Sequence, residues 1–128
     1  MSLTMAAIGS APVVYPIHID DAEYSTTSTT PALQKTFRFI QQPSTLIKSF
    51  DIYVSAWNAS SGAVTTITVS IDNGQNYTLT TSSTNESVLI YQSLPIPLVY
   101  GIHTFNLSLS TSNASYSAYT KLLEVYAS

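Results

Sequence analysis

The sequence contains no cysteine, so a disulfide scaffold, a thiolate metal site and a cysteine nucleophile are all excluded. Charged residues make up only 9% of the chain, whereas an average soluble domain has roughly 25%. The basic residues are Lys35, Arg38, Lys48 and Lys121. Nucleic-acid binding and polybasic contact with a membrane both need a cluster of basic side chains, so we expect neither.

The sequence also has no apolar run long enough for a transmembrane helix, which needs about 20 residues. Its apolar N-terminal stretch, residues 1–17, contains no lysine or arginine, whereas a signal peptide begins with a basic region. Two interpretations stay open, a leader that has already been removed or export by a route such as virion assembly. Either one places the protein on a virion, outside the cell or at the cell surface.

The motifs of common catalytic sites are missing as well. With only four glycines there is no Gly-rich phosphate loop, and the G-x-S-x-G signature of a nucleophilic serine does not occur. The seven acidic residues are too scattered to suggest a glycosidase pair. His103 lies on an apolar strand face, so we predict a hydrogen-bonded core or subunit-contact histidine rather than a base. We therefore expect no enzyme activity, and no cofactor apart from the calcium ion considered below.

What the sequence does contain is a strong β pattern. β-Branched and aromatic residues recur with a period of two, and no stretch sustains the helical spacing of apolar residues. We predict strands at about residues 13–19, 36–41, 46–57, 65–71, 75–80, 87–92, 101–110 and 118–126. Asn73-Gly74 is typical of the two central positions of a type I′ hairpin turn. Segment 94–98 contains two prolines, which lack amide donors, so we expect an edge or a connection there.

One apolar and one polar face per strand is typical of antiparallel sheets that bury a single face. About eight short strands in 128 residues predict an all-β, antiparallel two-sheet β-sandwich that resembles a jelly roll. We expect residues 18–128 to form this single domain. Residues 1–17 are predicted to be an extended N-terminal arm or edge strand, able to add to a neighbour's sheet.

Five of the six asparagines stand in N-x-S/T frames, which accept N-linked glycans. They are Asn58, Asn76, Asn85, Asn106 and Asn113. Two of them fall on outward positions of their predicted strands, and the other three fall in or beside predicted loops. Two explanations stay open: glycosylation outside the cell, or the high serine and threonine content of a polar surface.

Residues 18–23, HIDDAE, gather three of the seven acids. Asp20, Asp21 and Glu23 offer oxygen ligands for a structural Ca²⁺, joined by Glu124 if the chain ends meet. The alternative is a solvated acidic loop. The low-complexity segment that follows, STTSTT at residues 25–30, is interpreted as an exposed loop.

The aromatic residues include nine tyrosines and one tryptophan. Tyr53 and Trp57 share the outward face of one predicted strand, and Tyr116 and Tyr119 lie in or near the last loop. Exposed aromatic rings stack on sugars or anchor protein interfaces, so these four are candidate ligand or interface residues. The alternative is that this face packs against a loop or the second sheet.

The C-terminal segment LVYGIHTFNLSLSTSNASYSAYTKLLEVYAS resembles the closing strands of galactose-binding-type jelly rolls. Gly101, His103 and Glu124 stand where that family has a Gly-x-His and a late acid. The resemblance implies a jelly roll, in a family whose members often bind carbohydrate and sometimes hold a structural Ca²⁺. The usual sugar-binding loop residues have no counterpart here. In composition alone, the whole chain is similar to small structural proteins of archaeal viruses and archaeal surface filaments.

These observations favour a non-enzymatic structural subunit of a virion or extracellular surface assembly. Such a subunit works by packing against copies of itself or against other structural proteins. The low charge, the glycan frames and the missing basic leader all fit this hypothesis. The alternative is a carbohydrate-binding or adhesion module of jelly-roll type, with glycans as partners of Tyr53 and Trp57.

Overall fold

The computed structural model describes residues 15–44 and 46–128. Within these residues the chain forms nine strands: β1 (Tyr15–Asp20), β2 (Tyr24–Thr26), β3 (Ala32–Gln41), β4 (Ser49–Asn58), β5 (Thr65–Ile71), β6 (Tyr77–Thr81), β7 (Ser87–Pro95), β8 (Gly101–Thr111) and β9 (Ala118–Ala127). All eight predicted strands are present, and β2 is the addition. None of the described residues belongs to a helix long and apolar enough to cross a membrane.

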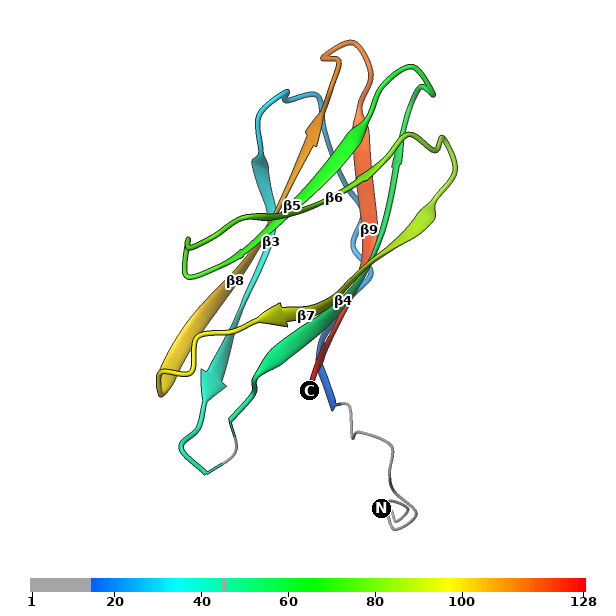
Figure 1. Cartoon of the computed structure of the whole chain (residues 1–128). Coiled ribbons are helices and arrows are strands. Elements are labelled where there is room, and N and C mark those ends of the chain that lie inside the picture. Colours follow the sequence, from blue (N-terminus) through cyan, green and yellow to red (C-terminus); the bar gives the residue numbers. More distant parts are fainter. Residues whose placement is uncertain (1–14, 45) are drawn as a thin grey trace, which may run out of the picture.

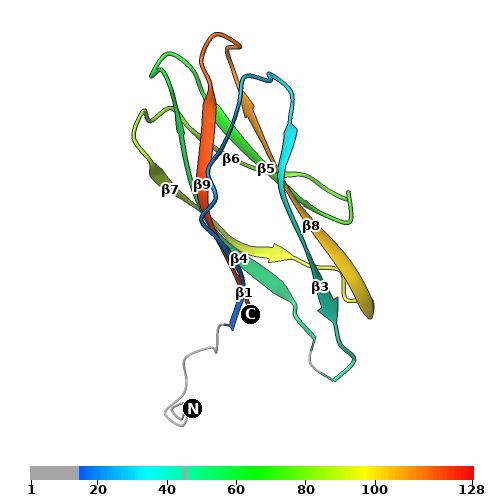
Figure 2. The same cartoon turned by 180° about the vertical axis from the view of Figure 1, so that it is seen from behind.

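The strands form two antiparallel sheets packed face to face, which Figures 1 and 2 show from opposite sides. The five-stranded sheet has the order β1-β9-β4-β7, with β2 also paired to β9, and the four-stranded sheet has the order β3-β8-β5-β6. Because β1 and β2 pair with successive parts of β9, they act as one interrupted edge strand. If β1 and β2 are counted as one strand, the sandwich has eight strands, the number found in a jelly roll. The predicted two-sheet sandwich is confirmed.

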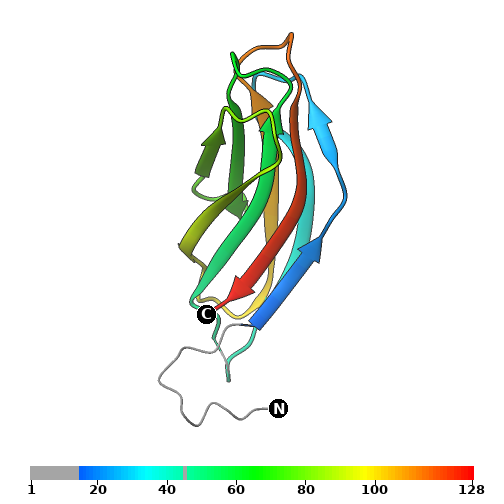
Figure 3. The same cartoon turned by 90° about the vertical axis from the view of Figure 1, so that its right-hand side faces the viewer.

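β1 lies at the edge of the five-stranded sheet, beside the last strand. Tyr15 is opposite Ala127, and Figure 3 shows the start of β1 and the C-terminus at the same end of the molecule. Residues 15–17 of the predicted arm therefore form an edge strand of this chain's own sheet. Residues 1–14, the rest of that prediction, lie outside the described residues.

The core lies between the inner faces of the two sheets and follows the predicted alternation. Phe50, Ile52 and Val54 of β4 are at most 1% exposed, and they share one cluster with Phe105 of β8. The rings of Phe39 and Phe50 meet edge to face, with centroids 4.9 Å apart, and so join the two sheets. Each fully buried side chain of this size contributes about 1.5–3 kcal/mol. The core therefore fixes which residues of each strand face outward.

The β5–β6 turn differs from the sequence prediction by one residue. Asp72 and Asn73 have φ values of 53° and 56°, and the Gly74 N–H donates to the Ile71 carbonyl at 2.9 Å. The central positions are therefore Asp72 and Asn73, which tolerate the left-handed region better than most residues. A long-range contact explains the shift, because Asp72 Oδ1 accepts the Thr104 N–H at 2.8 Å.

β2 occupies part of the segment that the sequence predicted as an exposed loop. Ser25 and Thr26 pair with Tyr119 and Ala118 of β9. The edge of β9 is free beyond the end of β1, and its backbone groups need hydrogen-bond partners. This long-range requirement, rather than local sequence preference, makes the start of the segment a strand.

Candidate functional site

Four aromatic rings stand in two pairs on the outer face of the five-stranded sheet. Trp57 of β4 lies opposite Tyr119 of β9, and their rings are parallel within 5°, with centroids 5.1 Å apart. Tyr53 and Tyr126 come from the same two strands, and their rings are nearly perpendicular, at 83°, with centroids 5.8 Å apart. The alternate residues of both strands are buried in the core, so these rings stand on the solvent side.

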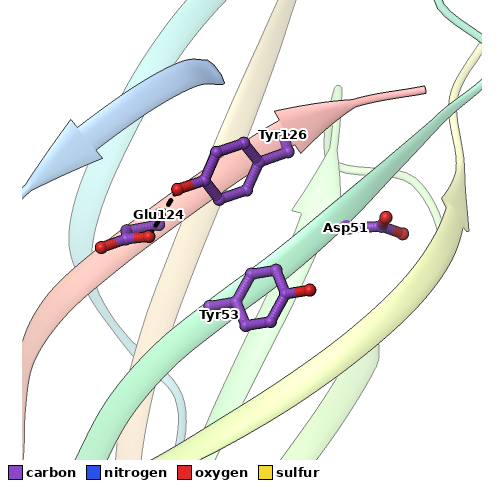
Figure 4. A pocket seen from close by; sticks show the side chains of 4 residues that line it. All are labelled: Asp51, Tyr53, Glu124 and Tyr126. Atoms are coloured by element: carbon purple, nitrogen blue, oxygen red, sulfur yellow. Dashed lines mark hydrogen bonds between the residues drawn. The ribbon is translucent and has the colours of Figure 1, made fainter. Parts of the chain in front are cut away.

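A shallow hollow of about 330 Å³ lies on this face between β4 and β9 (Figure 4). Asp51 and Tyr53 line it from β4, and Glu124 and Tyr126 line it from β9. The Tyr126 hydroxyl donates to Glu124 Oε1 at 2.6 Å, and this bond raises the pKa of Tyr126 because it favours the protonated phenol. Asp51 Oδ1 accepts the Ser93 N–H at 2.9 Å. The hydrogen bonds thus hold both carboxylates in place.

An adjoining hollow of about 170 Å³ shares Tyr53 and Glu124 with the first and continues to Ser55, Val88 and Leu122. We call the two hollows together the trough. Val88 is 66% exposed, so the wall on the β7 side is apolar and open to solvent. At a rise of about 3.3 Å per residue, Trp57 stands about 13 Å from Tyr53 along β4. Aromatic rings are therefore spread along a face longer than one sugar ring.

The structure brings three of the four predicted aromatic residues onto one face. Tyr53, Trp57 and Tyr119 share it, whereas Tyr116 lies in the loop between β8 and β9 and is 42% exposed. Sequence reasoning missed Asp51, Glu124 and Tyr126 as residues of the site. Alternation does place all three outward, but only the pairing of β4 with β9 brings them together.

The three predicted calcium ligands do not come together. The described part of the chain contains no group of three or more His, Cys, Asp or Glu side chains that could hold a metal ion. Asp20 instead accepts the Ala22 N–H at 2.9 Å, which lowers the pKa of its carboxyl, and lies 3.4 Å from Lys35 Nζ. The described geometry therefore gives no support to a calcium site formed by Asp20, Asp21 and Glu23, and that site stays a prediction.

Lys35 is buried because its ammonium fills the gap between β1 and β2. Its Nζ donates to the Lys121 carbonyl at 2.5 Å and to the Asp20 carbonyl at 3.5 Å. Burial lowers the pKa of Lys35, and the nearby Asp20 carboxylate opposes that shift. The contacts of this acidic segment are thus structural, because they close the interrupted edge of the sheet.

The five glycan frames fall into two groups. Asn58 is 0% exposed, and its amide donates to Thr65 Oγ1 and Thr111 Oγ1, both at 3.1 Å. A glycan on this nitrogen would break these bonds and would need space inside a packed region. The buried position therefore disfavours a glycan on Asn58 in the folded protein. The others stay predictions: Asn76, Asn85 and Asn113 are exposed, and Asn106 is half-buried.

His103 is a buried core histidine with both ring nitrogens engaged. Nδ1 lies 2.5 Å from Asp72 Oδ2, and Nε2 lies 2.6 Å from the Val99 carbonyl. Both partners are hydrogen-bond acceptors, so both ring nitrogens donate when the ring is an imidazolium; the bond to Asp72 is the main cause of the raised pKa of His103. The ring also stacks on Phe39. His103 is therefore a clamp between β8, the β5–β6 turn and the segment after β7.

No protein-family model and no curated protein sequence matches this chain. Among solved structures, the CBM36-1 domain of a multidomain xylanase from the hindgut metagenome of Trinervitermes trinervoides gives a TM-score of 0.57 at 10% identity, covering 81% of this chain and 96% of that chain. A carbohydrate-binding module CBM36 in complex with calcium and xylotriose gives a TM-score of 0.53 at 10% sequence identity. The match covers 81% of this chain and 98% of that chain. The structure of the infectious bursal disease virus Gx strain gives a TM-score of 0.48 at 13% sequence identity. This match covers 90% of this chain and 36% of that chain.

The two carbohydrate-binding modules show that the fold is shared, and they confirm the jelly-roll resemblance seen in the C-terminal third. Identities this low carry over neither a ligand nor a site residue. The TM-score of the viral match, 0.48, is too low to support an argument. The compositional similarity to archaeal virus proteins stays a prediction.

Proposed function

We propose that this chain is a non-enzymatic carbohydrate-binding module whose ligand lies along the outer face of the five-stranded sheet. The observation that carries the proposal is the trough, where tyrosine rings and carboxylates meet on an uncovered sheet face. Two structures with the same fold are carbohydrate-binding modules, and this supports the choice of ligand class. An extracellular location fits a ligand of this kind.

The chemistry of the trough suits a sugar chain. Aromatic faces attract the apolar C–H faces of pyranose rings, and carboxylate oxygens accept hydrogen bonds from hydroxyl groups. Tyr53 lies at the junction of the two hollows, so a bound chain would contact its ring wherever it crosses the trough. Trp57, already stacked on Tyr119, offers a second platform farther along β4.

Replacing Tyr53 with alanine should weaken the binding of an oligosaccharide about ten-fold, which corresponds to about 1.4 kcal/mol. An aromatic contact contributes about 0.5–1.5 kcal/mol beyond the area that it buries. The measurement is a screen on immobilised xylan, galactan and other neutral polysaccharides, followed by calorimetric titration with oligosaccharides of the best ligand. Trp57→Ala in the same titration tests the far end of the face.

Tyr100→Ala is the matched control, because Tyr100 is 60% exposed but lies between β7 and β8, outside the trough. Each titration is run with Ca²⁺ and with a chelator, since one structural neighbour is described in complex with calcium. Equal affinities of the parent and the Tyr53→Ala protein would place the ligand elsewhere. Failure of the parent protein to bind any member of the panel would overturn the proposal.

A second candidate function is a structural subunit of a virion or extracellular surface assembly, and an exposed apolar area favours it. Ile40 and Ile102 pair across β3 and β8 and are 60% and 62% exposed. Leu98 and Val99, just before β8, are also exposed. Exposed apolar side chains that lie together mark interaction sites, so the face with the Ile40–Ile102 pair is the proposed packing surface between copies.

Light scattering after size exclusion, at several protein concentrations, tests this second function. Assembly predicts a defined multimer whose mass returns to that of the monomer when Ile102 is replaced by lysine, because a charge is costly to bury in an apolar contact. A parent protein that stays monomeric at every concentration, and that Ile102→Lys leaves unchanged, would contradict self-assembly.

A further inference from the structure

The groups that line the first hollow are mainly hydrogen-bond acceptors. The Tyr126 hydroxyl donates its proton to a hydrogen bond with Glu124 Oε1, and Asp51 Oδ1 accepts a hydrogen bond from the Ser93 N–H. Within residues 15–44 and 46–128, no hydrogen bond engages the second oxygen of either carboxylate, and an ionised carboxylate only accepts. Among the four lining side chains, the Tyr53 hydroxyl is the one donor that has no partner among the described residues. A ligand that fits this hollow must therefore bring donors.

The two carboxylates also have no positive partner in the described part of the chain. The ion pairs found there are Lys35–Asp20 and His103–Asp72, and neither involves Asp51 or Glu124. Two acidic groups on one shallow surface create a negative potential that attracts cations and repels anionic groups. An acidic sugar, such as a uronate or a sulfated residue, is therefore disfavoured.

The two tyrosine rings add a second reason to expect a cation. Tyr53 and Tyr126 stand nearly perpendicular, at 83° with centroids 5.8 Å apart, so they do not cover each other's faces by parallel stacking. Figure 4 shows them between the carboxylates, with one ring from each strand. Aromatic faces attract ammonium groups within about 6 Å of the ring centroid. The ring faces and the carboxylates thus both favour a cationic group.

We infer that the first hollow takes a primary ammonium group, so that the ligand is a glycan with free amino sugars; this inference rests on the proposed function. An ammonium group carries three hydrogen-bond donors and no acceptor. It therefore complements both the carboxylate oxygens and the tyrosine ring faces of the hollow. A neutral hydroxyl also presents lone pairs, for which the hollow offers a single donor. The hollow is shallow and continues into the adjoining one, which suits an amine attached directly to a ring in a chain of rings.

The test compares two tetrasaccharides with the same backbone, a glucosamine tetramer and its fully N-acetylated form, by calorimetric titration. We expect the free-amine form to bind the parent protein at least about ten-fold more tightly, with the difference shrinking as salt is added. In Asp51→Asn and Glu124→Gln proteins the preference should fall to about two-fold or less. Both amides keep an oxygen that can accept the existing bonds from Ser93 and Tyr126, so the fold should persist.

Glu86→Gln is the matched control, because Glu86 is exposed in the loop before β7 and should leave the preference unchanged. Equal affinity for the two tetramers would overturn the inference but leave the proposed function standing. Failure to bind these tetramers and every neutral glycan of the panel would overturn both. A lysine tetrapeptide that bound as tightly as the glucosamine tetramer would also overturn the inference, because the hollow would then select charge without a sugar.

Discussion

Replacing Asn58 with alanine is expected to lower the free energy of unfolding by about 2–4 kcal/mol. The Asn58 amide donates to the hydroxyls of Thr65 and Thr111, and its oxygen accepts the Ser60 N–H, each at 3.1 Å. Thr111 Oγ1 in turn donates to the Tyr116 carbonyl at 2.8 Å. One side chain therefore joins the end of β4 to β5, β8 and the last loop. Its loss removes buried hydrogen bonds that water cannot readily replace.

Thermal or denaturant unfolding measures this effect, and a fall in Tm of roughly 10 °C is expected for a domain of this size. Asn76→Ala is the control, since Asn76 also stands in a glycan frame but is exposed, and a surface substitution changes stability by at most about 0.5 kcal/mol. If the two variants were equally stable, the Asn58 network would not support this end of the sandwich.

The same residue gives a test of the glycan frames. Protein secreted by a glycosylating host should carry no glycan on Asn58, whatever the state of the exposed frames, and peptide mass spectrometry determines the occupancy. A glycan found on Asn58 in folded protein would contradict the buried position. This outcome concerns accessibility and is independent of the stability measurement.

The position of Asn58 shows where sequence reasoning succeeded and where it was incomplete. Phe50, Ile52, Val54 and Ala56 alternate inward as predicted, and Asn58 is the next inward position of the same strand. The alternation thus already placed Asn58 in the core. The glycan frame and the expected loop favoured the surface, but a buried asparagine is acceptable when all its polar groups are bonded.

Buried polar residues of β3 follow the same rule. Lys35 and Gln41 occupy inward positions in line with Phe37 and Phe39, and they are 4% and 1% exposed. Their partners are distant in sequence: Lys35 Nζ reaches the Lys121 carbonyl, and Gln41 Nε2 donates to the Pro97 carbonyl at 3.0 Å. Periodicity predicts whether such a polar side chain points inward or outward. Only the folded chain shows which groups form its hydrogen bonds.

The candidate site was predictable only in part, for a related reason. The alternation correctly predicted which residues of β4 and β9 point outward. The residues that line the hollow could therefore be read from the sequence pattern of each strand. The hollow itself depends on the register that places Tyr53 opposite Glu124 and Asp51 opposite Tyr126. A shift of one residue would turn every side chain of a strand to the other face, and register between strands this far apart in sequence is not a local property.

Replacing His103 with phenylalanine is expected to destabilise the protein by about 1–2 kcal/mol near pH 6 and to remove a pH dependence above it. Phenylalanine keeps the ring beside Phe39 but cannot donate to Asp72 or to the Val99 carbonyl. The value is modest because the Asp72 side chain is 40% exposed, and solvent screens its charge.

The sign of the pH dependence follows from the two pKa shifts. The bond to Asp72 raises the pKa of His103 above its ordinary 6.5, so its stabilisation is complete below pH 6.5 and is lost as the pH rises through the folded-state value. The bond to His103 lowers the pKa of Asp72 below 3.8, so its stabilisation is present above pH 3.8 and is lost as the pH falls through that lower value. The full pair therefore acts between pH 3.8 and 6.5.

Denaturant unfolding across pH 5–9 measures the prediction, with nuclear magnetic resonance following the histidine ring signals. The parent protein should lose stability above pH 6.5, while His103→Phe and Asp72→Asn should give flatter curves over the same range. His18→Phe is the control: His18 stacks on Phe37, and its ring has no hydrogen bond to the described residues, so this variant should keep the parent's dependence. A parent curve that stayed flat, or a His103→Phe curve that fell in parallel with it, would mean that the clamp does not depend on the imidazolium.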